Sequence, residues 1–219
     1  MTPTVLLVDD HSLIRSGIRS LLDSISEVKV VGEAAGGRAA LEMCQSLHPD
    51  VVLADVEMPE LNGIETTRQI CAANPNIKVI MLSTYGDPQY VFESLRAGAF
   101  GYVLKEAAFT ELLAAIRAVA AGRRYLSPQL ADLVMEDYAR RGTGTGPEPA
   151  SDLEKLSPRE REVLQLVAEG HSSAQVARLL HISVRTVDAH RFNVMQKLDI
   201  HSIAGLTKFA IVHGLTSVR

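Results

Sequence analysis

The stretch DVVLADVEMPELNG, residues 50–63, constrains the fold of this chain more than any other part of its sequence. Its apolar run, Val51–Ala54, has the length of a buried strand and stops at one carboxylate, Asp55. Met58-Pro59 and Asn62-Gly63 then turn the chain. Ligands of open parallel sheets bind at the carboxyl ends of the strands, so an Asp that ends such a strand lies where chemistry is usually carried out.

A second apolar run, TVLLVDD at residues 4–10, ends in the acidic pair Asp9 and Asp10. If its strand is parallel and adjacent to the one that ends at Asp55, three carboxylates meet at one edge of the sheet. These like charges cannot all stay ionised without a counter-ion, and Mg²⁺, a hard cation with oxygen ligands, would neutralise them. Mg²⁺ beside a free carboxylate suits phosphoryl transfer onto that carboxylate. Solvated strand-end acids are the alternative, which a lone Asp would favour but this acidic pair does not.

Strand-like and helix-like patterns alternate five times over the first 121 residues. The expected strands are Val5–Val8, Lys29–Val31, Val51–Ala54, Lys78–Leu82 and Phe100–Leu104, and the expected helices are Ser12–Ser24, Ala39–Leu47, Gly63–Ala73, Asp87–Ala97 and Thr110–Ala121. This alternation predicts an α/β domain over residues 4–121, with a parallel sheet and helices on both faces. The flavodoxin-like strand order 2-1-3-4-5 would set the first and third strands side by side, as the acidic site requires.

The remainder of the chain reads as a linker, residues 122–152, followed by an all-α domain, residues 153–217. The linker contains an expected helix, Gln129–Arg140, and a tether rich in Gly, Thr and Pro, Gly142–Ser151. Four expected helices follow, Pro158–Glu169, Ala174–Leu180, Val184–Leu198 and Ile203–His213. Because a tight turn joins the middle two, they predict a four-helix, helix-turn-helix domain.

Charge and cysteine usage narrow the class of protein. Residues 151–219 carry net +2 and residues 1–150 carry net −6, which fits a control domain joined to a nucleic-acid reader. The sequence lacks a signal-peptide pattern and a run of the ~20 apolar residues that a membrane helix needs, so we expect a cytoplasmic protein. Cys44 and Cys71 lie in apolar helical patterns without metal-ligand spacing, and we expect reduced core residues.

Both halves resemble known families at these motifs. Residues 4–121 are similar to the receiver domain of two-component response regulators, with matches at Asp9-Asp10, Asp55, Met58-Pro59, Gly63, Ser83 and Lys105. Residues 153–217 resemble the LuxR-type helix-turn-helix through LSPREREVLQLVAEG, IS-x-RTV-x-x-H and Lys197-Leu198. The two motif sets in this order are typical of the NarL/FixJ family of response regulators.

The resemblance implies a phosphorylation site. Asp55 would accept a phosphoryl group from a histidine kinase. Asp10, Asp55 and the backbone carbonyl of Glu57 would hold Mg²⁺, and Asp9 would help through a water molecule. The receiver would act as an enzyme only on its own phosphorylation and dephosphorylation.

The resemblance also implies a switch. Lys105 would pair with Asp55 and later with a phosphate oxygen, as a compact charge on a long stem can do. Ser83 would hydrogen-bond the phosphate, and Tyr102 would turn inward to fill the space that is left. Glu106 stands where many receivers carry a Pro after a cis bond, which leaves the geometry of this loop open.

The helix over residues 184–198 is the expected major-groove helix. Its predicted DNA-binding residues are Arg185, Thr186, Asp188, Ala189, His190, Arg191, Phe192, Gln196 and Lys197. A solvated helix face is the alternative. Asp188 departs from the Lys that is common there; because a carboxylate repels phosphate but can accept from cytosine N4, we expect either fewer phosphate contacts or a shifted sequence preference. Ser173 stands where Asn is usual, which leaves the local cap or contact open.

The last helix carries an apolar stripe with Ile203, Leu206 and Phe209. Core packing is its default role, and part of it could form a two-fold dimer contact, since helix-turn-helix proteins read paired half-sites. We expect a phosphorylation-switched transcription regulator that is a homodimer when active. Its expected partners are a sensor histidine kinase and double-stranded DNA, with RNA polymerase as a further candidate and no membrane.

Two alternatives differ in class. An aspartyl-phosphate hydrolase would need an Asp two residues after the nucleophile, where Glu57 stands, and would leave the helix-turn-helix without a role. A DNA-binding regulator with a receiver that is never phosphorylated stays open, although the intact Asp9, Asp10, Asp55 and Lys105 argue against it.

Overall fold

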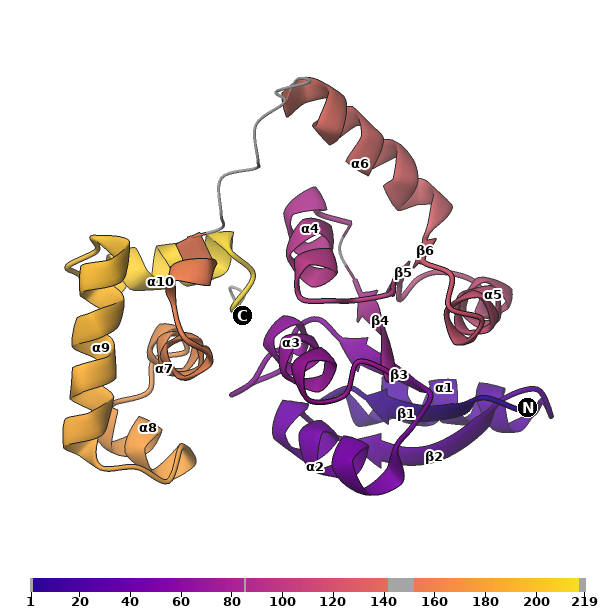
Figure 1. Cartoon of the computed structure of the whole chain (residues 1–219), viewed down its shortest axis with the longest axis horizontal. Helices are drawn as coiled ribbons and strands as arrows, with labels where there is room; N and C mark the ends of the chain where they lie inside the picture. The colour runs from indigo at the N-terminus through magenta and orange to yellow at the C-terminus, as the bar shows by residue number, and fades with distance from the viewer. Residues whose placement is uncertain (1, 85, 142–151, 217–219) are drawn as a thin grey trace. The chain divides into compact units, whose positions relative to one another are not determined.

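A computed structural model describes residues 2–84, 86–141 and 152–216 of the 219-residue chain. The chain forms two compact units, Met1–Thr143 and Gly144–Arg219 (Figure 1). The expected linker helix therefore belongs to the first unit, and the expected tether, Gly142–Ser151, lies outside the described residues. Among the helices that the structure describes, none is long and apolar enough to cross a membrane.

The N-terminal unit is built on a parallel sheet of six strands in the order β2-β1-β3-β4-β5-β6 (Figure 1). The strands are β1 (Thr4–Val8), β2 (Lys29–Ala34), β3 (Val51–Asp55), β4 (Lys78–Ser83), β5 (Gly101–Leu104) and β6 (Tyr125–Leu126). The first five follow the predicted order. β2 is longer than predicted, because the apolar pattern breaks at Gly32 although the pairing with β1 continues to Ala34. β6 was not predicted, since two residues are too few to show a period.

The described part of this unit has six helices, and their ends lie within two residues of the predicted ones. They are α1 (Ser12–Asp23), α2 (Gly37–Leu47), α3 (Gly63–Ala73), α4 (Pro88–Arg96), α5 (Phe109–Ala120) and α6 (Pro128–Arg141). Local side chains fix where two of them begin. The Asn62 side chain accepts from the backbone N–H of Glu65 at the start of α3. At the start of α4, the side chain of Asp87 accepts from the backbone N–H of Gln89, and Pro88 is the first helical residue.

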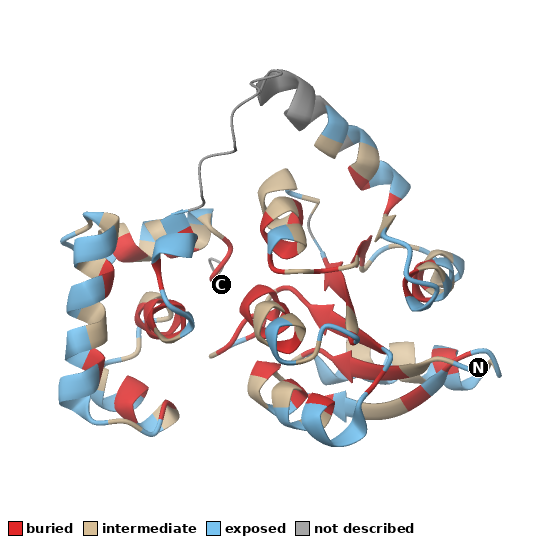
Figure 2. Ribbon diagram, in the orientation of Figure 1, coloured by how far each residue is buried: buried red, intermediate tan, exposed pale blue. Residues whose placement is uncertain are grey.

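Alternate residues of the strands feed two separate cores, one on each face of the sheet (Figure 2). Leu6 and Val8 of β1 face a core completed by α2, α3, α4 and Leu130 of α6. Val5 and Leu7 face a core completed by α1 and α5. Because both faces are covered, the inner strands β1, β3 and β4 are apolar except at their ends, where their polar side chains lie.

Over residues 152–216, the C-terminal unit has four helices after a short 3-10 helix. These are η1 (Asp152–Lys155), α7 (Pro158–Ala168), α8 (Ser173–Leu179), α9 (Val184–Leu198) and α10 (Ile203–Val212). Both expected capping boxes are present, Ser157 with Glu160 and Ser172 with Gln175. The four helices were predicted; η1 was not. Buried Arg161 of α7 donates to the carbonyls of Leu153 and Leu156 and so ties η1 to the unit.

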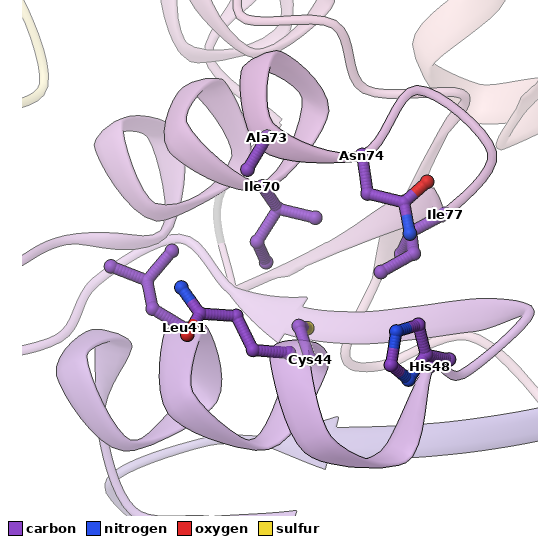
Figure 3. A pocket seen from close by; sticks show the side chains of 8 residues that line it. Leu41, Cys44, His48, Ile70, Ala73, Asn74 and Ile77 are labelled. Carbon is purple, nitrogen blue, oxygen red and sulfur yellow. The ribbon is translucent and has the colours of Figure 1, made fainter.

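A cavity of about 180 Å³ opens between the C-terminal ends of α2 and α3 (Figure 3). It is lined by Leu41, Cys44, Gln45, His48, Ile70, Ala73, Asn74 and Ile77. Burial, and then the neighbouring Cys71, raise the pKa of the Cys44 thiol to about 11. The thiolate is the reactive form of cysteine, so Cys44 is a packing residue despite the adjoining cavity.

We expect Cys44 to react with iodoacetamide roughly 100-fold more slowly in the folded protein than in urea at mildly alkaline pH, because the raised pKa leaves about that much less thiolate. A Cys71→Ser variant isolates this thiol, and mass spectrometry over time measures its labelling. Equal rates in the folded and unfolded chain would show that the thiol is open to solvent.

Candidate functional site

Three carboxylates meet at the carboxyl edge of the sheet, as the sequence predicted. β1 and β3 pair in parallel with Val8 opposite Ala54, so the residues that follow, Asp9 and Asp55, lie next to each other. Asp9 is 2% exposed and Asp55 3% exposed, whereas Asp10 is half-buried. One oxygen from each of the three acids and one ring nitrogen of His11 all lie within 4.8 Å of one another.

Lys105 completes this cluster from the end of β5. Its Nζ lies 2.7 Å from Asp55 Oδ2 and 2.8 Å from Asp9 Oδ2. Its backbone N–H donates to the carbonyl of Ser83 at 2.7 Å, which fixes the Lys beside the end of β4. Burial acts to lower the pKa of Lys105, but its hydrogen bonds to Asp55 and Asp9 outweigh burial and raise that pKa.

Burial dominates the electrostatics of Asp55 and raises its pKa to about 6. The hydrogen bond and charge of Lys105 lower this pKa only in part, Asp9 raises it further, and the N–H of Glu57, 3.3 Å from Oδ1, lowers it slightly. More carboxylate charge is therefore gathered here than Lys105 neutralises. A further cation would relieve the imbalance.

The donor set fits Mg²⁺. Carboxylate oxygens are the ligands that this hard cation prefers, and Asp9, Asp10 and Asp55 supply them from one small region. His11 was not predicted to belong to the cluster: its Nδ1 lies 2.9 Å from Asp10 Oδ1, and its side chain is 60% exposed. Its position directly after the acidic pair was the available signal. An imidazole adds little for Mg²⁺, and its exposed ring can leave the site without disturbing the fold.

Ser83 and Tyr102 lie on neighbouring strands beside the acidic cluster. Ser83 ends β4 and is 3% exposed, and Tyr102 of the adjacent β5 is fully buried and shares a hydrogen bond with Ser83. Burial raises the pKa of Tyr102 above its usual range. The inward position predicted for the phosphorylated state is thus the one that this structure has. Among the described residues every peptide bond is trans, including the one before Glu106.

The predicted DNA-facing stripe of α9 is exposed. Ser183 caps the helix by accepting from the N–H of Thr186 at 3.1 Å. Val187 and Val194 are buried, whereas the opposite face is open to solvent and carries Arg185, Asp188, Ala189, Phe192 and Gln196. Phe192 is 63% exposed, which is unusual for a large apolar side chain in the middle of a helix face.

Comparison with known families covers both units. The family described as "Response regulator receiver domain" matches residues 5–117, and "Bacterial regulatory proteins, luxR family" matches residues 154–210. The chain is a NarL/FixJ-family response regulator. It is accordingly a DNA-binding transcriptional regulator of a two-component system.

This response regulator is similar along nearly its whole length to several known ones. It is 38% identical to response regulator UvrY of Escherichia coli over 98% of the chain and 96% of UvrY, and 36% identical to response regulator GacA of Pseudomonas aeruginosa over 96% of each. Among solved structures, RcsB of Salmonella enterica serovar Typhimurium, bound to promoter rprA with the phosphomimetic BeF3−, matches with a TM-score of 0.59 and 29% identity. That match covers 95% of this chain and 98% of RcsB.

Several of the predicted contact residues of the response regulator are engaged within its own C-terminal unit, among them Lys197 and Leu206. The Nζ of Lys197 donates to Glu160 Oε2 at 2.7 Å and joins α9 to α7. Although burial acts to raise the pKa of Glu160, the bonds from Lys197 and Ser157 hold it below its usual value. Leu206, a predicted dimer contact, is 1% exposed and packs in the core with Val194.

The other residues of the predicted dimer stripe are more open. Ile203 is 50% exposed at the start of α10. Phe209 is half-buried, and its ring centroid lies 4.1 Å from that of His213. Of the three residues, only Ile203 thus offers a large exposed surface, and a dimer contact on α10 stays a prediction.

Proposed function

We propose that Asp55 accepts a phosphoryl group from the phosphohistidine of a sensor kinase, and that this change alters the affinity of the C-terminal unit for double-stranded DNA. One observation carries the proposal. Asp55 is a buried carboxylate at the end of β3, 2.7 Å from Lys105 Nζ and grouped with two further carboxylates.

In this reaction a carboxylate oxygen of Asp55 attacks phosphorus, and the bond from phosphorus to the histidine nitrogen breaks. Because the other ring nitrogen of the phosphohistidine carries a proton, the ring leaves as neutral imidazole. Lys105 turns from the carboxylate toward a phosphoryl oxygen. Asp10, Asp55 and the carbonyl of Glu57 would hold Mg²⁺, with Asp9 acting through water. When bound, Mg²⁺ supplies positive charge that offsets the charge of the phosphoryl oxygens. Water later cleaves the acyl phosphate, so the receiver catalyses both its own phosphorylation and its own dephosphorylation.

The phosphoryl group would act on the rest of the unit through Ser83 and Tyr102. A phosphoryl oxygen competes with Tyr102 for the hydroxyl of Ser83, and the carbonyl of Tyr102 accepts from Ser127 N–H at 3.0 Å. Ser127 also donates from its hydroxyl to Glu111 and precedes α6, whose Leu130 packs in the same core as Tyr102. A change at Tyr102 therefore has a bonded route to α6, the last described element before the C-terminal unit.

In the C-terminal unit, α9 would enter the major groove with its exposed stripe toward the bases. Arg185, His190 and Arg191 would contact phosphates. A homodimer formed partly through Ile203 would read paired half-sites, and RNA polymerase is a further candidate partner. RcsB bound to a promoter supports this use of the unit. The regulator would act in the cytoplasm, where its DNA lies.

Phosphorylation is expected to raise the affinity of the full chain for its selected DNA at least about fivefold, the lower end of typical coupling between sites. Fluorescence anisotropy with a duplex selected from genomic DNA measures this with and without acetyl phosphate and Mg²⁺, and Asp55→Asn serves as the unresponsive control. A labelled protein with unchanged affinity would instead support a regulator whose DNA binding is independent of phosphorylation. Absence of DNA binding in both states would refute the proposed function.

A further inference from the structure

A small hydrogen-bonded group joins α8 to the exposed stripe of α9. The hydroxyl of Ser173 donates to Asp188 Oδ1 at 2.8 Å and accepts from Arg191 Nη1 at 2.7 Å. Ser173 begins α8, whereas Asp188 and Arg191 lie three residues apart on α9. The hydroxyl of Ser173 therefore holds one acidic and one basic side chain of the DNA-facing helix in fixed positions.

An acid in this position calls for a physical reason. Asp188 is exposed on the same face as Arg185 and Phe192, in a domain whose residues 151–219 carry only net +2. A carboxylate on a surface that approaches DNA is repelled by the phosphates, so it weakens binding to any sequence. The presence of this carboxylate is explained if it discriminates among bases. A well-placed base contact favours the right sequence over the wrong one by a factor similar to, or larger than, the loss of affinity that the repulsion causes.

We propose that Asp188 is a specificity-determining residue that accepts a hydrogen bond from the N4 amino group of a cytosine in the major groove, and that Ser173 positions its carboxylate for this contact. The inference rests on the proposed function, since it requires α9 to enter the major groove. Ser173 occupies Oδ1, and we assign Oδ2 to the base. A side chain already held in one orientation loses less freedom when it binds.

The chemistry of the base edges selects cytosine. In the major groove guanine presents two acceptors and thymine an acceptor beside a methyl group, and neither can donate to a carboxylate. Adenine offers its N6 amino group, but the adjacent N7 is an acceptor that repels the second oxygen. Cytosine offers an amino donor without an acceptor beside it on the same base. Arg191, held next to Asp188 through Ser173, offsets part of the repulsion between the carboxylate and the backbone.

Selection from randomised duplexes by the full chain tests this inference. The wild-type protein is expected to enrich cytosine at one position of each half-site by about tenfold. Asp188→Ala should lose that preference alone, and should bind an unrelated duplex several-fold more tightly because one repulsive charge is gone. Asp188→Asn should change the preference at the same position to adenine, since an amide can bond both N6 and N7.

Two further variants separate readout from charge and from folding. Glu154→Ala removes an exposed acid of the same unit that lies on η1 and not on the DNA-facing stripe of α9, and it should leave the selected sequence unchanged. Ser173→Ala should weaken the cytosine preference roughly threefold to tenfold at that same position, with a thermal midpoint close to wild type. A general loss of structure would instead weaken binding to every sequence alike.

The outcomes distinguish this inference from the function on which it rests. A wild-type chain that binds no DNA refutes the proposed function itself. A wild-type chain that selects a sequence, with Asp188→Ala and Asp188→Asn selecting the same base at every position, overturns only the role of Asp188. Selection of adenine by the wild type at the affected position overturns the assignment to cytosine.

Discussion

Replacing Asp55 by asparagine is expected to abolish labelling of this response regulator by acetyl phosphate and Mg²⁺. The amide is not a nucleophile at phosphorus, and the other acids of the cluster would be left as ligands of the cation. Intact-mass spectrometry after incubation should show a phosphoryl adduct on the wild-type chain and none on Asp55→Asn.

A matched control lies two residues away. Glu57→Gln removes a carboxylate from the same loop but keeps the backbone carbonyl that we expect to face the cation, so its labelling should equal that of the wild type. An adduct that persists in Asp55→Asn would place the acceptor on another residue and would remove the basis of the proposed function.

The same substitution should stabilise the N-terminal unit when no divalent cation is present. Folding raises the pKa of Asp55 from 3.8 to about 6, so the folded state disfavours the charged carboxylate. The resulting destabilisation is absent below pH 3.8, grows as the pH rises toward 6, and is constant above that value. We therefore expect Asp55→Asn to raise the free energy of unfolding by about 3 kcal/mol at neutral pH and by much less near pH 4.

Urea unfolding at the two pH values measures this difference. Mg²⁺ favours the charged carboxylate, so its addition should stabilise the wild type more than Asp55→Asn and so reduce the gap between them. A gap that is equally large near pH 4 would show that burial of the Asp55 charge is not its cause.

The fold of both units could be predicted because each element carries its own local signal. Buried runs such as Val51–Ala54 have the length of a strand, and side chains such as Asn62 and Ser157 mark where helices begin. Elements too short to show a periodic hydrophobic pattern were not predicted: β6 has two residues, and η1 has a single turn. The predicted β2 ended before Gly32, because the later residues of this strand are held by pairing with β1 and not by an apolar pattern.

The candidate site likewise contains residues that the sequence predicted and contacts that it could not predict. Asp9, Asp10 and Asp55 were predicted together because each one ends or follows an apolar strand of the same sheet, whereas the position of Lys105 beside them was implied by the resemblance to receiver domains. The ion pair of Lys197 with Glu160 could not be predicted, since it joins residues 37 positions apart and depends on how α7 packs against α9. The bonds of Ser173 to α9 are equally non-local, so the sequence showed only that its residue type was unusual.

Gly63→Ala should unfold the N-terminal unit or displace Asp55, through the addition of one methyl group. A Cβ at Gly63 would lie 1.9 Å from the backbone oxygen of Asp55 and 2.9 Å from Met81 Cε. The oxygen cannot rotate away, because the next residue, Val56, is held between the carbonyl of Leu82 and the N–H of Gly63. We expect a loss of about 4 kcal/mol or more, a large fraction of the stability of a domain.

Gly17→Ala is the matched control for this change. A Cβ at Gly17, within α1, meets no atom within 4 Å, and alanine favours a helix, so this variant should gain roughly 0.5–1 kcal/mol. Far-UV circular dichroism during urea unfolding of the full chain compares the two variants. Because both add the same methyl group, their difference isolates the close approach of α3 to the end of β3. If Gly63→Ala still folds, the carbonyl of Asp55 must have moved, and labelling by acetyl phosphate should fall as a result. A Gly63→Ala variant that keeps both wild-type stability and wild-type labelling would contradict this packing.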